Sequence, residues 1–521
     1  MTRFLLGVWI LFLGVHAMAA DWALGTASSM VKVPQTGPVA PVGAEGMALS
    51  LAGNEREAVQ LVVSAGDRPL KGVRVAASPL VGEGRANWPL DRATRDRPDG
   101  IALNLVAYVH LPAFDRWDPD PLPPYRPFDV EAGRNQPVWV TVAAPKGQAA
   151  GTYQSEITVT PDGEQPRAVP LTVSVYGFSL PEVPFGRTAF GIWPDGIAQQ
   201  HHVKPGSAEA EELYRKYYEF LLDHLISPYS IPGDIKSPQA KRYFDDPRMT
   251  GYVIPYTDDE AKLKDTTDYL RQNGWLAKGY FYPLDEPVTK EQYDQADGLW
   301  SRIKRVAPDA KIVAPFYRGP DFAPDQTIFG IAAEHLNIWC PNTGYFNSPE
   351  VQAAMYQRLK RGDELWWYVC CGPGAPLANF FVHEDAIDHR VLMWQQKLYG
   401  ITGLLYWSTT YWNPQAGTAD PWVDMATVKD INPSIYGDGA LIYPGAKVGV
   451  DGPVSSMRLE LIRDGIEDYQ YLSMLQRCAG LTEAKAAAGE VARSLTEYVK
   501  DPAELLRVRD EVAKRIEESQ R

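Results

Sequence analysis

The sequence has few cysteines, no long apolar run beyond its first 20 residues and no excess of basic residues. Four cysteines in 521 residues are too few for a disulfide-stapled scaffold, and none is spaced with histidine as in a zinc site. The net charge of −14 disfavours nucleic acid and anionic membrane surfaces as partners. No glycine-rich phosphate loop follows an early strand, which disfavours a nucleotide-binding fold. A neutral or cationic ligand fits this composition better.

The first 20 residues have the pattern of a secretory signal peptide. Arg3 precedes an apolar run from Phe4 to Val15, and the small residues at 17–20 (AMAA) form a cleavage site. The run is too short to span a bilayer, which needs about 20 residues. We therefore expect residues 1–20 to be removed, no membrane span in the mature chain, and a periplasmic or extracellular location.

Residues 21–180 are predicted to form a β-sandwich. Short runs rich in β-branched and aromatic residues alternate there with clusters of Gly, Pro and Asp, the spacing typical of an all-β domain. The proline-rich segment 180–184 indicates an extended linker out of this domain.

A different pattern begins after the linker. Between residues 186 and 445, short apolar runs alternate with helical periodicity, which predicts β/α units and, over this length, one (β/α)₈ barrel. Residues 446–521 have helical periodicity and are expected to form a C-terminal extension that packs on the barrel. The predicted fold class is therefore multidomain, with a sandwich, a barrel and a helical extension.

The adjacent acids Asp285 and Glu286 are the strongest candidates for chemistry. They end an apolar, strand-like segment at 279–284, and barrel active sites are built where strands end. A helix cap is the structural alternative for Asp285. However, Thr289 and Gln292 already form a capping-box pattern for the next helix. We therefore favour a functional role for both acids.

Two consecutive carboxylates restrict the mechanism. Ordinary glycosidases hold two acids about 5 to 9.5 Å apart on opposite sides of the scissile bond, and sequence neighbours seldom straddle a sugar. They suit substrate-assisted hydrolysis, in which the 2-acetamido oxygen of the substrate is the nucleophile. One acid then protonates the leaving oxygen, while its neighbour orients the acetamido N–H.

Several motifs resemble those of glycoside hydrolase family 123, the retaining β-N-acetylgalactosaminidases, and those of related proteins that share its catalytic domain. They lie at residues 54–62, 151–153, 284–287, 366–370, 403–407, 437–439, 443–445 and 463–469. The resemblance covers nearly the whole mature chain. It implies that Glu286 is the general acid/base, that Asp285 positions the acetamido group, and that neither metal nor cofactor is used. The implied partner is a glycan or oligosaccharide, and N-acetylgalactosamine is the best single guess for the terminal sugar that is removed.

Aromatic side chains are expected to contact the substrate, because sugar rings present apolar C–H faces. Candidates lie at or just beyond the expected strand ends: Trp193, Tyr317, Trp339, Tyr345, Trp367, Tyr368 and Trp407. Of these, Trp407, Tyr317 and Trp339 are favoured. Any one of them is also compatible with a place in the core.

Three other groups of residues have structural explanations. The acids of segment 463–469 lie on the helix face opposite its apolar stripe, which favours a structural role. Cys370 and Cys371 are either buried thiols or a functional pair, and the first is favoured. The histidines at 201–202 and 383 lack the spacing of a metal site.

Two alternatives remain open. One is a glycosidase of different sugar specificity, in which Glu286 works with a distant carboxylate. Candidates for that partner are Asp195, Asp420 and Asp424. The other is a secreted carbohydrate-binding protein without turnover. Oligomeric state is not indicated by the sequence.

Overall fold

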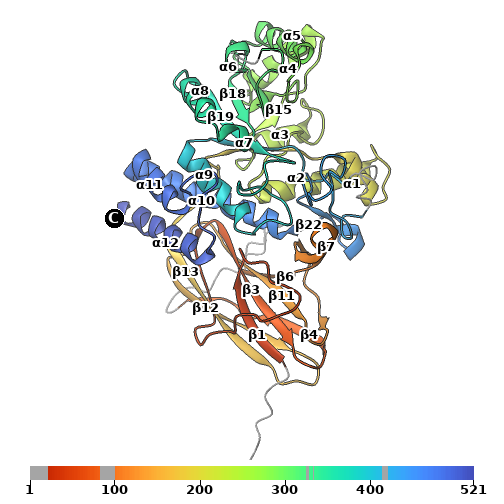
Figure 1. Cartoon of the computed structure of the whole chain (residues 1–521), viewed down its shortest axis with the longest axis vertical. Helices are drawn as coiled ribbons and strands as arrows, with labels where there is room; N and C mark the ends of the chain where they lie inside the picture. The colour runs from red at the N-terminus through yellow and green to blue at the C-terminus, as the bar shows by residue number, and fades with distance from the viewer. Residues whose placement is uncertain (1–21, 83–99, 324–327, 333, 413–419, 521) are drawn as a thin grey trace, which may run out of the picture.

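The computed structural model describes residues 22–82, 100–323, 328–332, 334–412 and 420–520. The predicted signal peptide lies outside these residues. Among the described helices, none is long and apolar enough to cross a membrane. Figure 1 shows a strand-rich N-terminal part, a part built on a parallel sheet, and helices of the C-terminal region between them.

The N-terminal part consists of two sheets that share one apolar core. The first has the order β1 (Trp22–Ser28), β3 (Glu55–Ala65), β11 (Asn135–Ala144), β6 (Gly100–Leu105). The second has the order β10 (Phe128–Val130), β4 (Leu70–Ala77), β12 (Gly151–Thr160), β13 (Arg167–Ser179), β2 (Met47–Gly53), and β5 (Val81–Gly82) pairs with β12. Alternate residues of both sheets point inward, among them Leu61, Val140, Ile157 and Val173, as period-two patterning requires.

A seven-stranded parallel sheet follows. Its order is β14 (Arg187–Phe190), β20 (Gly403–Tyr406), β19 (Glu364–Val369), β18 (Ile338–Pro341), β17 (Lys311–Phe316), β16 (Gly279–Phe281), β15 (Tyr252–Val253). Residues 227–229 bridge its two edges: Tyr229 N donates to Phe190 O (2.9 Å) and Val253 N donates to Tyr229 O (2.9 Å). The sheet is thus barrel-like, with the bridge in second place and β16 in fourth place along the chain.

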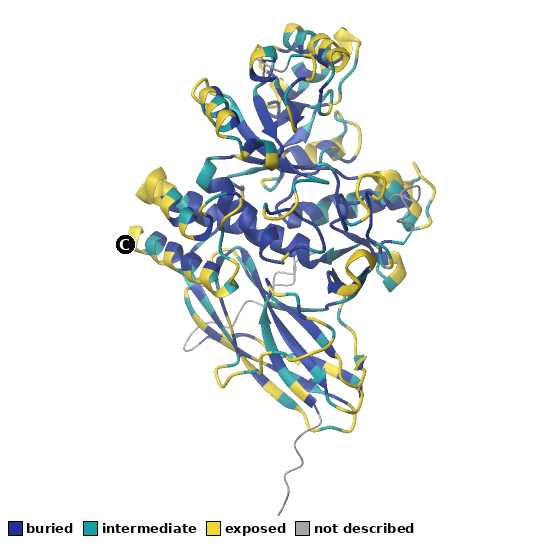
Figure 2. Cartoon of the chain, in the orientation of Figure 1, coloured by how far each residue is buried: buried dark blue, intermediate teal, exposed yellow. Residues whose placement is uncertain are grey.

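Helices alternate with these strands and cover the outside of the sheet. They are α1 (Pro194–Gln200), α2 (Ala208–Asp223), α3 (Pro238–Phe244), α4 (Glu260–Gln272), α5 (Lys290–Val306), α6 (Ile328–Ile331), α7 (Thr343–Phe346), α8 (Pro349–Leu359) and α9 (Asp388–Tyr399). The largest apolar core lies between these helices and the outward face of the strands, for example at Tyr218, Trp300 and Leu392. Figure 2 shows the exposed residues gathered on the outer faces of α4, α5 and α8.

Short elements connect the N-terminal sheets to the barrel-like sheet. They are the hairpin β7 (Tyr108–Leu111) and β8 (Arg116–Pro119), joined by η1 (Pro112–Phe114), and the small sheet β9 (Pro121–Leu122), β22 (Pro453–Ser456), β21 (Tyr443–Pro444), the last followed by η2 (Gly445–Val448). Since β9 precedes the linker and β22 follows the barrel strands, the two parts of the chain share a sheet.

Three helices end the chain: α10 (Met457–Ala479), α11 (Leu481–Val491) and α12 (Pro502–Ser519). The α10 helix is buried over most of its length, because it packs on α9 as well as on apolar residues of the N-terminal sheets, such as Ala52 and Phe178. The extension therefore contacts both the sandwich-like part and the barrel-like part.

The acids of segment 463–469 are buried, not solvated. The fully buried Arg390 of α9 forms ion pairs with Asp468 (2.7 Å) and with Glu57 of β3 (3.0 Å). Arg509 of α12 also pairs with Asp468 (3.0 Å). Arg463 pairs with its neighbour Asp464 (2.5 Å). Helices α9, α10 and α12 are thus joined to β3 by buried ion pairs, which supports the structural interpretation of the segment.

Candidate active site

The acids Asp285 and Glu286 lie in the turn between β16 and α5. The helix does not use them as caps: Thr289 accepts from Gln292 N, and the Gln292 side chain accepts from Thr289 N at 2.9 Å, the complete capping box. The capping prediction is confirmed. Both acids therefore lie, without a capping role, at the carboxyl end of the sheet, the end at which barrel active sites are built.

Glu286 is half-buried and has an unusual backbone. Its φ is +42°, in the left-handed region that non-glycine residues rarely adopt, and such outliers gather at functional sites. The Tyr368 hydroxyl, from β19, donates a hydrogen bond to Glu286 Oε1. Burial raises the pKa of Glu286, the Tyr368 hydrogen bond opposes this shift, and the charge of Asp285 adds to it. The side chain is thereby biased towards its protonated form.

Asp285 is exposed and held by a tyrosine. The Tyr282 hydroxyl donates to Asp285 Oδ1 at 2.6 Å, and the Tyr282 ring packs edge-on against Tyr229 at 5.9 Å. Burial raises the pKa of the Tyr282 phenol well above its usual value, so this phenol remains a donor. Asp285 is therefore oriented while its side chain stays open to solvent.

Both carboxylates affect the same buried thiol. Burial raises the pKa of the Cys340 thiol, in β18, and the charges of Asp285 and Glu286 raise it further. Both acids follow β16 in the turn before α5, and both carboxylates therefore lie within electrostatic reach of one buried thiol.

An apolar plug fills the barrel beneath the acids. Its buried members come from alternate positions of the strands: Ala189, Tyr280, Val313, Ile338, Cys340, Trp366, Tyr368 and Leu405. Tyr368 lies at the carboxyl end of β19 and is only 3% exposed. Little of its ring surface is therefore open to a sugar.

Trp407 is half-buried at the end of β20 and is fixed by a buried acid. Its Nε1 donates to both oxygens of Asp438 (3.2 Å each). A Cβ on Gly439 would lie 2.3 Å from the indole, so the ring requires glycine there. Burial raises the pKa of Asp438 to about 6. Asp438 was not among the predicted site residues, although the Gly-Asp-Gly sequence at 437–439 marks the turn.

Arg458 holds the loops around this indole together. The fully buried guanidinium donates to Phe380 O (2.9 Å), after β19, and to Gly437 O (2.8 Å), after β20. It also pairs with Asp120 (2.9 Å), which precedes β9. A residue of the N-terminal part thus takes part in positioning the turn that carries Asp438.

Two predicted sugar contacts need correction. Trp339 and Trp367 are fully buried on the helix-facing side of the sheet. Trp339 donates from Nε1 to Asp363 (2.9 Å) and stacks on Phe329. Their neighbours Cys340, Trp366 and Tyr368 take the inward positions, and period-two alternation turns Trp339 and Trp367 outward. Neither indole is available to a substrate.

The other predicted aromatics remain near the carboxyl ends of the strands. Trp193 follows β14 and is 50% exposed, and Tyr317 follows β17 and is 45% exposed. Tyr345 lies in α7, half-buried against Phe316. Their positions at strand ends leave all three compatible with sugar contacts.

The alternative carboxylate partners are differently placed. Asp420 pairs with Lys447, and Asp424 pairs with Lys429 at 2.6 Å. Asp195 is exposed in the first turn of α1. The ion pairs of Asp420 and Asp424 make these two acids less suitable as nucleophiles than an unpaired carboxylate.

Among the described residues, no group of three or more His, Cys, Asp and Glu side chains is arranged to hold a metal ion. His201 contacts the hydroxyl of Tyr217 (2.9 Å). His383 stacks between Phe114 and Phe381. Both histidines therefore have structural contacts of their own.

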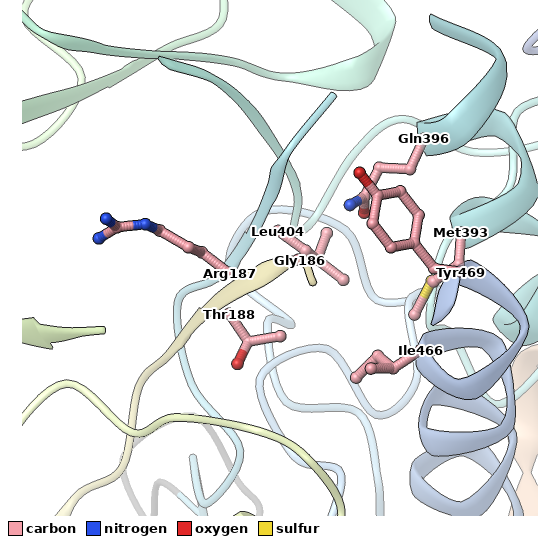
Figure 3. A pocket seen from close by; sticks show the side chains of 8 residues that line it. All are labelled: Gly186, Arg187, Thr188, Met393, Gln396, Leu404, Ile466 and Tyr469. Atoms are coloured by element: carbon pink, nitrogen blue, oxygen red, sulfur yellow. The ribbon is translucent and has the colours of Figure 1, made fainter. Parts of the chain in front are cut away.

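A small pocket lies at the opposite end of the strands from the acids. Its lining includes Arg187 and Thr188, at the start of β14, and Tyr469 of α10 (Figure 3). In a parallel sheet the amino ends of all strands share one edge, so this pocket and the acid pair are separated by the length of the barrel. A sugar bound at the acids would not reach it.

Comparison with known proteins gives one family. Residues 216–475 match the description "Glycoside hydrolase 123, catalytic domain", and both acids lie within this range. No curated protein sequence matches the chain. The structure is similar to that of a family 123 glycoside hydrolase from Clostridium perfringens, analysed for glycolipid glycan hydrolysis, with a TM-score of 0.69, 14% identity, and coverage of 95% of this chain and 97% of that chain.

Other solved structures resemble the chain only weakly. A family 39 glycoside hydrolase from Bacteroides cellulosilyticus WH2 gives a TM-score of 0.31 at 9% identity, covering 75% of this chain and 82% of that chain. A GH5 xyloglucanase from Bacteroides ovatus gives 0.27 at 9% identity, covering 82% and 99%. Neither supports an argument about this chain.

Proposed function

Since the chain belongs to glycoside hydrolase family 123, we propose that this glycoside hydrolase removes terminal β-linked 2-acetamido sugars, foremost N-acetylgalactosamine, with retention of configuration. The observation that carries the proposal is that two consecutive carboxylates follow β16, each bound by a tyrosine hydroxyl, and that the pKa of one of them, Glu286, is raised. Glycan chains of glycolipids, which the Clostridium perfringens relative is described as hydrolysing, are one source of such sugars.

In the first step, protonated Glu286 donates its proton to the glycosidic oxygen. The acetamido oxygen of the substrate attacks the anomeric carbon as the glycosidic bond breaks, which gives an oxazolinium ion and a free alcohol. Asp285 accepts a hydrogen bond from the acetamido N–H and stabilises the positive charge that develops on the ring. Tyr282 keeps this carboxylate in place through its hydroxyl.

In the second step, Glu286 acts as a base. Its carboxylate takes a proton from water, the water oxygen bonds to the anomeric carbon, and the oxazolinium ring reopens to the acetamide. Two inversions at one carbon give net retention. The Tyr368 hydroxyl stabilises the carboxylate form of Glu286, so the same residue is usable in both steps.

Trp407 is the proposed platform for the sugar. Its indole is half-buried at the barrel mouth and held by Asp438, so stacking costs little side-chain freedom. Trp193, Tyr317 and Tyr345 are the further aromatics proposed to border the bound glycan.

The test uses p-nitrophenyl β-N-acetylgalactosaminide, β-N-acetylglucosaminide and β-galactoside. We expect turnover of an acetamido p-nitrophenyl substrate but not of the galactoside. With an oligosaccharide substrate, whose leaving group is not activated, Glu286→Gln and Asp285→Asn should each lose about 10²–10⁴-fold in kcat. Glu291→Gln, an exposed acid in the first turn of α5, is the matched control. Cleavage of the galactoside, or an initially inverted product by NMR, would overturn substrate assistance.

Export remains part of the proposal. The leader at residues 1–20 would place the enzyme in the periplasm or outside the cell. The intact mass of the protein purified from its host should correspond to a chain that starts at Asp21. A chain that retains Met1 would exclude signal-peptide cleavage.

A further inference from the structure

Cys370 and Cys371 form a pair of free thiols at the carboxyl end of β19. They are consecutive in sequence, both half-buried, and their sulfur atoms lie 3.7 Å apart. A disulfide bond is about 2.05 Å long, so the two sulfurs have to move closer together to form one. The other two cysteines differ, since Cys340 is fully buried and Cys478 lies on the exposed end of α10.

The two thiols pack on two apolar clusters that also include residues of the candidate active site. Cys370 packs on the apolar plug that contains Tyr368, two residues before it in the chain. Cys371 packs with Trp407 on the cluster of Phe381, Val428 and Ile435. One thiol therefore packs on the cluster that contains Tyr368, and the other packs on the cluster that Trp407 also contacts.

The electrostatics agree with this position. The hydrogen bond from Cys370 lowers the pKa of the Cys371 thiol, whereas burial and the charges of Asp438 and Glu286 oppose that shift. A thiol with a lowered pKa is the better attacking group in disulfide exchange. Cys371 is thus the one suited to react first, and Cys370 is in contact to complete the reaction.

The loop around the pair is held by amide side chains. Asn379 donates to Cys370 O (2.9 Å), and Asn342 donates to Gly372 O (3.0 Å). Because these contacts fix the backbone on both sides, closure of the sulfurs must be taken up locally, next to Tyr368 and Trp407.

We propose that Cys370 and Cys371 form a reversible vicinal disulfide in the wall of the candidate active site, closed by small-molecule disulfides, and that closure lowers activity by changing the shape of this wall. Cys371 thiolate attacks an oxidant of the type RSSR, which gives a mixed disulfide and RS⁻. Cys370 then attacks the Cys371 sulfur and releases the second RSH. Two protein thiols are oxidised, one disulfide is reduced, and both protons leave with the products.

Reversibility follows from the covalent geometry. Consecutive Cα atoms are about 3.8 Å apart, less than the usual separation of about 4.4 to 6.8 Å across a disulfide, and such bridges are more easily reduced. The site would therefore respond to the redox state of its surroundings. The activity effect rests on the proposed function, whereas the bridge itself does not.

The chemical test does not depend on turnover. The full chain is treated with oxidised glutathione, and peptide mass mapping is expected to show loss of two hydrogens from the peptide with both cysteines. Reduced protein should bind one equivalent of phenylarsine oxide, which bridges two thiols and releases water, and prior oxidation should block this adduct. Cys478→Ser should behave like the native chain, and Cys371→Ser should form neither product.

Specific outcomes would overturn the proposed bridge or its proposed effect on activity. An adduct that is lost in Cys340→Ser but kept in Cys371→Ser would assign the reactive pair to other residues, and a persistent glutathione adduct without closure would exclude the bridge. For activity, oxidation should lower kcat/KM by about tenfold or more, as small displacements at active sites do, and dithiothreitol should restore it. An equally active bridged enzyme would refute control of activity. An enzyme that forms the bridge but has no glycosidase activity would fail only the proposed function.

Discussion

Tyr368 donates a hydrogen bond from the end of β19 to Glu286 in the turn that follows β16. The two residues are 82 positions apart in the chain, and β17 and β18 lie between their strands. The hydrogen bond that lowers the pKa of Glu286 therefore depends on how the strands from β16 to β19 are arranged.

Replacing Tyr368 with Phe should move the pH dependence of catalysis. The hydroxyl stabilises the Glu286 carboxylate and opposes the rise that burial causes in its pKa, so its loss should raise this pKa further. The alkaline limb of kcat/KM, which reports the acid of the free enzyme, should shift to higher pH. Tyr293→Phe is the matched control, since Tyr293 is buried and its hydroxyl has no partner in the described part of the chain. An unshifted limb would separate Tyr368 from Glu286.

Trp407 and Trp339 should respond differently to Ala. Trp407→Ala removes the proposed platform and should raise KM for the acetamido substrate by about tenfold. Trp339→Ala empties a helix-facing core position and should lower the free energy of unfolding by about 3–5 kcal/mol, with KM of the folded enzyme unchanged. Steady-state kinetics and urea unfolding measure both. A raised KM for Trp339→Ala would contradict its place outside the barrel interior.

Arg390→Met should destabilise the protein strongly. The change leaves Glu57 and Asp468 buried with less compensation, and breaking a buried pair costs about 3–5 kcal/mol. Arg507→Met is the control: its pair with Glu511 is half exposed, and such surface pairs add little to stability. Equal losses in urea unfolding would show that the network adds no more than a surface pair.

Asp438→Asn should change how stability depends on pH. Burial raises the pKa of Asp438 in the folded chain to about 6, from 3.8, so the native carboxylate costs stability above pH 6 and this cost disappears as pH falls below about 4. The unfolding free energy of the variant minus that of the native protein should therefore be more positive at pH 8 than at pH 4. A difference that is constant over this range would refute the raised pKa.

The position of the acids could be predicted because its signals are local. An apolar strand that stops at two carboxylates, followed by a capping box at Thr289 and Gln292, leaves few other arrangements. Alternation of apolar runs and helices likewise indicated a parallel, barrel-like sheet, since each unit carries its own pattern.

The direction of the barrel aromatics could not be predicted in the same way. Trp366, Trp367 and Tyr368 are consecutive and all buried, so the sequence shows no polar face that would set the phase of the strand. Which of them points inward depends on strand register, a property of the closed sheet. Asp438 was missed for a related reason, because its partner Trp407 lies 31 residues away across a loop.

The acids of α10 show a further limit. Asp464, Glu467 and Asp468 alternate with apolar residues as on a solvated helix face, yet they are buried. Their ion-pair partners lie on segments far away in the chain. No local sequence pattern therefore distinguishes acids that form buried ion pairs from acids on a solvent-exposed helix face.

Arg458 links the N-terminal sheets to the loops of the candidate active site. Through its pair with Asp120, a segment that precedes the linker holds the turn under Trp407. An expression fragment that begins at residue 186 would leave this guanidinium buried without its carboxylate. We therefore expect that the barrel-like part does not work as an isolated domain. Truncated or grafted forms of the hydrolase need to keep the N-terminal sheets.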